Sequence, residues 1–111
     1  MKKILPLLFT ITPLFAQAGS TAESATIVRL MSDKNYPDYT FVELNKRNAS
    51  GGPSCGNSTT WNYVLDTSDA QGKKFNAVLL AAFAAGKKVT LAGTDNCPAV
   101  NVEGLRRIEI Y

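Results

Sequence analysis

The sequence predicts a small, mainly β domain with one helix and one disulfide. Short runs that alternate apolar and polar residues, typical of strands, lie on both sides of a single helical pattern. The two cysteines of the 111-residue chain, Cys55 and Cys97, stand behind an N-terminal segment that has the character of an export signal. Because exported proteins fold in oxidising compartments, this single pair predicts a structural disulfide.

The first 18 residues predict a secretory signal. Lys2 and Lys3 form the charged start, residues 4–15 the apolar stretch, and Ala16-Gln17-Ala18 a small-x-small cleavage site. We expect cleavage before Gly19, which leaves residues 19–111 as one domain. The apolar stretch is too short to span a bilayer, so no membrane insertion is expected once the signal is removed. The predicted location is the periplasm or the outside of the cell.

Composition excludes several classes of function. The formal net charge is +3, but Lys2 and Lys3 leave with the signal, so ten basic and nine acidic residues remain. A nearly neutral chain has no general attraction for nucleic acid. The chain has no histidine, and both cysteines are predicted to pair, which removes the usual nucleophilic and metal-binding groups. We therefore expect no enzyme, no cofactor and no metal.

Alternation predicts five strands. They span residues 25–32, 39–45, 59–66, 89–92 and 105–111. Residues 19–24 are small and polar and predict a loose start, whereas runs of turn-forming residues between the strands predict surface loops.

Strict alternation also predicts which side chains share a face of a strand. The expected groups are Ile27 with Arg29 and Met31, Trp61 with Tyr63 and Leu65, and Ile108 with Ile110. The last pair is expected to face the interior. Trp61 is expected to pack in the core in preference to stacking on a ligand, because large aromatic side chains dominate small cores.

One helix is predicted over residues 70–85. Its apolar residues recur at three- and four-residue steps: Phe75, Val78, Leu79, Ala82 and Phe83. Ser68 and Gln71 stand at the spacing of a capping box, and Gly86 marks the C-terminal stop.

Three strands, one helix and two strands is the element order of the OB-fold, a five-stranded Greek-key barrel. A two-layer α+β sandwich of the same elements is the alternative. A disulfide requires the α-carbons of Cys55 and Cys97 to lie within about 7 Å of each other. The cysteine pair therefore tests the architecture, since it must join the entrance of the third strand to the loop after the fourth.

Two stretches resemble known exported proteins. Residues 54–61, Ser-Cys-Gly-Asn-Ser-Thr-Thr-Trp, precede a helix that ends in Ala-Ala-Gly-Lys-Lys-Val-Thr-Leu at residues 84–91. This order remotely resembles the OB-fold B subunits of subtilase-type and pertussis-type toxins, over roughly residues 55–91. The resemblance implies a secreted subunit that binds host glycans as a pentameric ring.

A closer resemblance is to a group of small exported proteobacterial proteins. It rests on a cysteine before an aromatic strand, Asp66-Thr67-Ser68, Gly72-Lys73, Gly86-Lys87-Lys88-Val89 and a closing Cys97. This resemblance implies export and a disulfide, and it implies no particular activity.

Two groups of residues are candidates for ligand binding. Tyr36, Asp38 and Tyr39 surround the first predicted hairpin, where aromatic faces could stack on a sugar and a carboxylate could accept from its hydroxyls. Ordinary hairpin and strand positions explain the same residues. Asn57 and Ser58 follow Cys55 and could offer amide and hydroxyl groups to a polar ligand, or simply form the turn that leads into the third strand.

The predicted function is that of a secreted or periplasmic binding module, with glycan recognition and a homo-oligomeric ring as its toxin-like form. The alternative is an exported inhibitor or accessory protein that binds an envelope or extracellular protein. Small domains without an active site and closed by a disulfide suit this second role.

Overall fold

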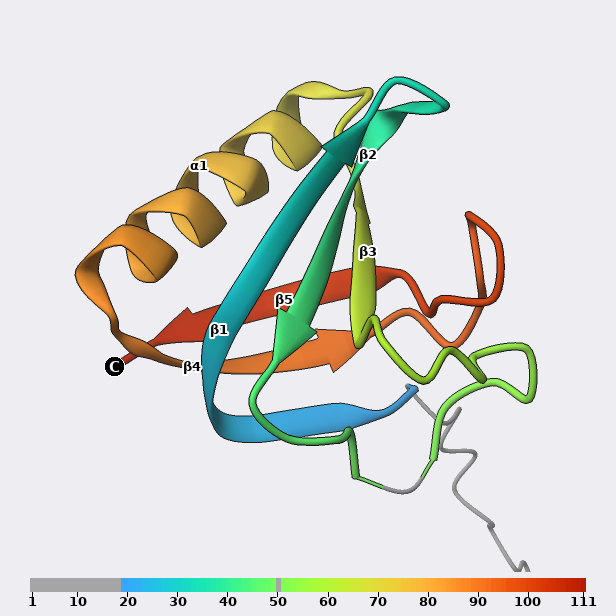
Figure 1. The fold of residues 1–111 in the computed structure, drawn as a ribbon, viewed down its shortest axis with the longest axis horizontal. Helices are drawn as coiled ribbons and strands as arrows, with labels where there is room; N and C mark the ends of the chain where they lie inside the picture. Colours follow the sequence, from blue (N-terminus) through green and yellow to red (C-terminus); the bar gives the residue numbers. More distant parts are fainter. Residues whose placement is uncertain (1–18, 50) are drawn as a thin grey trace, which may run out of the picture.

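Five antiparallel strands form one sheet, and a single helix connects the third strand to the fourth (Figure 1). The structure is a computed structural model that describes residues 19–49 and 51–111, so the predicted export signal lies outside the described residues. The mainly β class with one helix, and the predicted order of elements, are confirmed. The elements are β1 (Thr21–Asp33), β2 (Tyr36–Leu44), β3 (Tyr63–Asp66), α1 (Ala70–Ala85), β4 (Lys88–Gly93) and β5 (Leu105–Ile110).

The order of strands across the sheet is β3-β2-β1-β4-β5. The long first strand holds the two halves together, because its end pairs with β2 and its beginning pairs with β4. Figure 1 shows β1 bending strongly between these two partners. The predicted loose start at residues 19–24 is wrong, since β1 begins at Thr21. Ala22 and Ala25 are buried in the core, but such small side chains produce no visible hydrophobic pattern.

The two edge strands approach each other at one point. An isolated parallel bridge joins Val64 of β3 to Gly104, which directly precedes β5. Here the Val64 amide donates to the Glu103 carbonyl oxygen over 2.9 Å. No further ladder joins these edges in the part of the chain that the structure describes, so the sheet is not continuously closed.

Two apolar clusters lie on opposite faces of β2 and β3, because neighbouring residues in a strand point to opposite sides. The main core lies between the inner face of the sheet and the helix, and it includes Val42, Tyr63, Leu79 and Leu91. The second cluster consists of Phe41, Val64, Ala99 and Val102. Its last two members come from the loop between β4 and β5, so that loop covers the outer face of the sheet.

The predicted shared face of Ile27, Arg29 and Met31 is wrong. The register of β1 against β2 shifts between Ile27 and Arg29, which marks a bulge or irregularity at Val28. One extra residue reverses the alternation that follows it. Ile27 and Leu30 consequently both contact the main core, while Met31 packs against the second cluster.

Two other predicted faces also differ. β3 begins at Tyr63, so Trp61 precedes the strand and packs against the second cluster, whereas Tyr63 and Leu65 lie in the main core. Ile108 packs partly against the core, but Ile110 is 43% exposed, because it ends an edge strand.

The helix has the predicted bounds but a different N-cap. The Asp69 carboxylate accepts from the Gly72 amide over 2.7 Å, which satisfies one of the free donors of the first turn. Ser68 instead donates to the Asp66 carboxylate, and this bonding lowers the pKa of Asp66 below its ordinary value. The expected capping box is therefore absent. Gly86 is confirmed as the C-terminal stop, with a left-handed φ of 64°.

Among the described residues, the structure contains no helix of sufficient length and apolarity to cross a bilayer.

Candidate functional site

Two long loops form a polar pocket on one side of the sheet. The first loop, between β2 and β3, comprises residues 45–49 and 51–62, and the second, between β4 and β5, comprises residues 94–104. Figure 1 shows both on the side away from the helix. The pocket between them has a volume of about 290 Å³. Its polar lining includes Asn48, Asn57, Ser58, Asn62, Asn101 and Glu103.

The predicted disulfide is confirmed, and it joins the two loops that form the pocket. Cys55 and Cys97 are bonded, with their α-carbons 6.3 Å apart. Beside it, the Asn101 Nδ2 donates to the Asn57 Oδ1 over 2.8 Å, and the Ser58 amide donates to the Asn101 carbonyl over 3.2 Å. The opposite sides of the pocket are therefore linked covalently and by hydrogen bonds.

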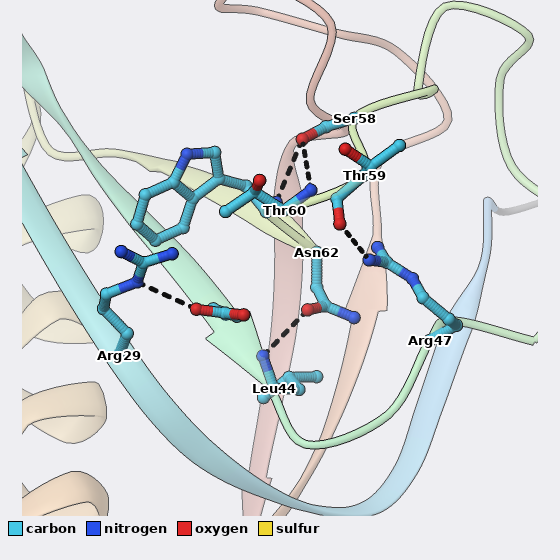
Figure 2. Close-up of polar contacts among 9 residues, drawn as sticks. Arg29, Leu44, Arg47, Ser58, Thr59, Thr60 and Asn62 are labelled. Atoms are coloured by element: carbon cyan, nitrogen blue, oxygen red, sulfur yellow. Dashed lines mark hydrogen bonds and ion pairs between the residues drawn. The ribbon is translucent and has the colours of Figure 1, made fainter.

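A buried asparagine holds the first loop to the sheet. Asn62 is 2% exposed, and Figure 2 shows its amide pointing toward Leu44, whose backbone N–H donates to Oδ1 over 2.8 Å. The Asn62 Nδ2 donates to the Lys46 carbonyl and to the Asn48 Oδ1. Asn48 in turn donates to the Ser20 Oγ over 3.1 Å. This chain of amides connects the pocket to the start of β1.

A buried carboxylate lies at the inner end of this network. Glu103 is 3% exposed. Its Oε1 accepts from the Ser20 Oγ over 2.5 Å, and its Oε2 accepts from the backbone amides of Ser20, over 3.2 Å, and Asp95, over 3.0 Å. These bonds replace the water that the carboxylate loses on burial.

Three glycines make room for this carboxylate. A Cβ added at Gly19 would lie 2.2 Å from the Glu103 Oε2, and one added at Gly93 would lie 2.1 Å from the same atom. One added at Gly52 would lie 3.0 Å from Oε1. The backbone therefore approaches the carboxylate from three segments of the chain, at positions where a side chain would collide with it.

Tyr63 reaches the same network from β3. Its hydroxyl lies 3.0 Å from the Ser20 Oγ, and the side chain is fully buried. Burial raises the pKa of Tyr63 to about 12; the hydrogen bond with Ser20 lowers it by less, and the negative charge of Glu103 raises it further.

We expect the phenolate of Tyr63 to form near pH 12 in the folded protein. An unfolded tyrosine titrates near pH 10, so the unfolded chain loses this proton first and the free energy of unfolding falls between about pH 10 and 12. An ultraviolet titration of the wild type and of Tyr63→Phe should differ by one step near pH 12. A difference centred at pH 10 would contradict the burial of this hydroxyl.

Trp61 connects the pocket to the second cluster. Its ring centroid lies 5.7 Å from that of Phe41, and it also lines the pocket. The Arg29 Cζ lies 4.6 Å from the ring centroid, while Arg29 Nε pairs with the Glu43 carboxylate over 2.8 Å. In Figure 2, Arg29 and Arg47 lie on opposite sides of the residues that are drawn as sticks. This cation–π contact, on one face of the indole, fixes the orientation of the Trp61 ring.

No family model, curated protein or solved structure matches this chain. The resemblance to toxin B subunits stays a prediction. A function must therefore be inferred from the pocket and the groups that line it.

The structure separates the two groups of predicted ligand-binding residues. Asn57 and Ser58 line the polar pocket. Tyr36 and Tyr39 instead line a shallow depression at the β1–β2 hairpin, and both rings pack partly against the second cluster. Asp38 is exposed beside them. The five residues thus do not form one site.

Each predicted residue also has a structural role. The Ser58 Oγ accepts from the amides of Thr60 and Trp61, as the turn interpretation expects (Figure 2). The Tyr39 hydroxyl donates to the Pro98 carbonyl over 3.3 Å, and the Tyr36 ring meets Phe41 edge-on at 5.4 Å.

The sequence did not predict most of the residues that line the pocket, among them Asn48, Asn62, Asn101 and Glu103. Asn48 and Asn101 lie in runs of turn-forming residues, where they were interpreted as parts of surface loops. Asn62 lies in the predicted third strand, residues 59–66, where alternation gave it no binding role. The one available signal for Glu103 is its position two residues before β5, between apolar Val102 and Gly104-Leu105.

Proposed function

We propose that this chain is an exported binding module whose polar pocket holds a small ligand rich in hydroxyl groups, with a saccharide as the ligand class. The observation that carries this proposal is the meeting of amide and hydroxyl side chains from two loops that a disulfide joins. Loops held in this way bind with little loss of conformational entropy.

Asn57 and Asn101 offer a matched donor and acceptor. One amide hydrogen bond connects them, from Asn101 Nδ2 to Asn57 Oδ1. Within residues 19–49 and 51–111, no protein group bonds to the Asn57 Nδ2 or to the Asn101 Oδ1. A free donor beside a free acceptor suits neighbouring sugar hydroxyls, which both donate and accept. Trp61 adds an aromatic edge to the same pocket.

We also propose that the sheet is a barrel of the OB-fold type. The strand order, the bent β1 shared by both halves, the parallel bridge at Val64 and the helix between β3 and β4 support this proposal. OB-folds bind ligands largely through the face of their second and third strands and the adjoining loops, including the loop between the fourth and fifth strands. In this chain that last loop supplies Asn101 and Glu103 to the pocket.

Export of the mature chain is part of the same proposal. The disulfide supports it, because such bonds persist in oxidising compartments.

A glycan array, followed by titration calorimetry with any saccharide that binds, tests the proposed function. We expect Asn57→Ala and Asn101→Ala each to weaken binding by about tenfold, as the loss of one or two hydrogen bonds would. Asn35→Ala is the matched control, because Asn35 lies in the turn between β1 and β2. Absence of binding across the array, or equal losses in all three variants, would contradict a saccharide site here.

A protein partner is the second candidate, and the helix surface favours it. Leu80 and Phe83 are 52% and 43% exposed and lie one turn apart on α1. The test compares capture from an envelope extract by the wild type and by a Leu80→Ser/Phe83→Ser variant. Sedimentation measured on both proteins separates a second copy of this chain from a different partner.

A further inference from the structure

The buried Glu103 carboxylate has no cationic partner among the residues that the structure describes. Both ion pairs found there, Arg29 with Glu43 and Arg107 with Glu109, lie elsewhere. The three groups that donate to Glu103 are uncharged, since two are backbone amides and one is a hydroxyl. A buried carboxylate without a counter-charge is costly, and a nearby cation would stabilise it.

The charged and titratable groups around Glu103 come from four segments. Tyr63 approaches from β3 through Ser20, and Asp95 follows β4 and donates its backbone amide. Arg47 lines the same pocket from the loop after β2, but its guanidinium donates to the Thr59 carbonyl over 3.0 Å (Figure 2). Arg106 approaches from β5, but its Nε donates to the Gly93 carbonyl over 3.1 Å. None of these four side chains forms an ion pair with the carboxylate.

Gly19 lies directly against the carboxylate. A Cβ on Gly19 would stand 2.2 Å from Oε2, so the backbone nitrogen of Gly19 lies within about 5 Å of that oxygen by ordinary covalent geometry. The next residue is fixed, because the Ser20 amide donates to Oε2 and the Ser20 carbonyl accepts from the Gly93 amide over 2.9 Å. The sequence predicts the end of the export signal at this same nitrogen.

Cleavage changes the charge of this nitrogen. In the precursor it is a neutral peptide amide. Hydrolysis of the Ala18–Gly19 bond consumes one water molecule, leaves a carboxylate on Ala18 and frees an amine on Gly19, which takes up a proton at neutral pH. The new ammonium group has three donors and one positive charge. It therefore arises beside the one buried carboxylate that has no cation among the described residues.

We propose that the α-ammonium of Gly19, created by removal of the export signal, forms a buried ion pair with the Glu103 carboxylate and so completes the fold of the mature protein. The proposal rests on the predicted cleavage site and is independent of the ligand. Gly19 is suited to this position because any side chain there would collide with the carboxylate.

The ion pair predicts a specific pH dependence. Pairing raises the pKa of the α-amine above its unfolded value of about 7.7–8.0. The resulting stabilisation is fully present below the unfolded pKa and is lost as pH rises through the folded pKa. Tyr63 titrates near pH 12, outside this window.

The test begins with the exported, processed protein. Mass spectrometry should show Gly19 as its first residue; a different first residue would overturn the proposal. A variant with one alanine inserted before Gly19 moves the amine one residue away from the carboxylate. We expect its melting temperature at pH 7 to fall by about 5 °C relative to the wild type, and the difference to disappear at high pH.

Direct titration of the amine provides a readout that a merely structural change would not move. In protein labelled with ¹⁵N-glycine and ¹³C-glycine, the Cα resonance of Gly19 should titrate above pH 8.0 in the wild type, and near 7.7 in Glu103→Gln. If Glu103→Gln does not fold, the variant with the inserted alanine supplies the comparison. An amine that titrates at about 7.7 in the folded wild type, together with equal melting temperatures, would overturn the proposal.

Discussion

Removal of the disulfide by the double substitution Cys55→Ser/Cys97→Ser is expected to lower the free energy of unfolding by about 4 kcal/mol. The two cysteines are separated by 42 residues in sequence, and opening so long a loop returns much conformational freedom to the unfolded chain. A loss of this size is comparable to the whole stability of many small domains.

The same substitution should also impair the pocket. Its two loops would then be held by hydrogen bonds such as that between Asn57 and Asn101. Urea unfolding of the wild type, of the reduced wild type and of the double variant measures the effect on stability. The reduced wild type is the control for the serine hydroxyls and should match the double variant. An unchanged denaturation midpoint in both would contradict a structural role for the disulfide.

Gly93→Ala is expected to destabilise the protein by about 3 kcal/mol, because the added methyl group would collide with the Glu103 carboxylate. The added Cβ would lie 2.1 Å from Oε2 and 2.2 Å from the carboxyl carbon. Either the Glu103 side chain or β4 must move, and both alternatives break hydrogen bonds of a buried charge. Gly93 has no left-handed φ, so the substitution tests space alone.

A double-mutant cycle separates this collision from a general effect on the strand. Glu103→Ala removes the obstructing atoms, so Gly93→Ala should cost much less in a Glu103→Ala background than in the wild type. Gly86→Ala is the matched control: its Cβ would meet no atom within 4 Å, and its cost of about 1 kcal/mol comes from the left-handed φ of 64°. Costs that add without coupling would show that the carboxylate is not the obstacle.

The elements that local chemistry controls were predictable from the sequence. The helix spans residues 70–85 as expected, because its apolar spacing and the stop at Gly86 act within a few residues of chain. The strands were predicted in number and order. The N-cap was misassigned to Ser68 because Asp69, one position later, competes for the same role.

The faces of the strands could not be predicted with equal success. The irregularity near Val28 depends on how β1 pairs with β2. It exchanges the two faces of the strand for the residues that follow it in β1, up to the next register shift after Ser32. Trp61 departs from the face of Tyr63 because β3 starts two residues after it. Both features depend on how one strand pairs with another. The periodicity of residues within a single strand carries no information about that pairing.

The candidate site was predictable only in part. Asn57 and Ser58 were chosen for their amide and hydroxyl groups beside Cys55, and they line the pocket. Tyr36, Asp38 and Tyr39 were chosen by the same chemical reasoning, but they lie at the hairpin of β1 and β2. Side-chain chemistry identifies groups that are able to bind, but it does not say which of them meet.

The sequence by itself determined the class of the fold, the order of its elements, the bounds of the helix and the cysteine pair. These follow from spacing and composition along the chain, and from the absence of any other cysteine. The tertiary structure alone decided that the two joined loops enclose a polar pocket, and that Glu103 is buried against Gly19 and Gly93. The reason is physical, because a pocket is made by contacts between segments that are distant in sequence. How closely these segments approach depends on strand register and on glycines, whose lack of a side chain leaves space for the neighbouring segment.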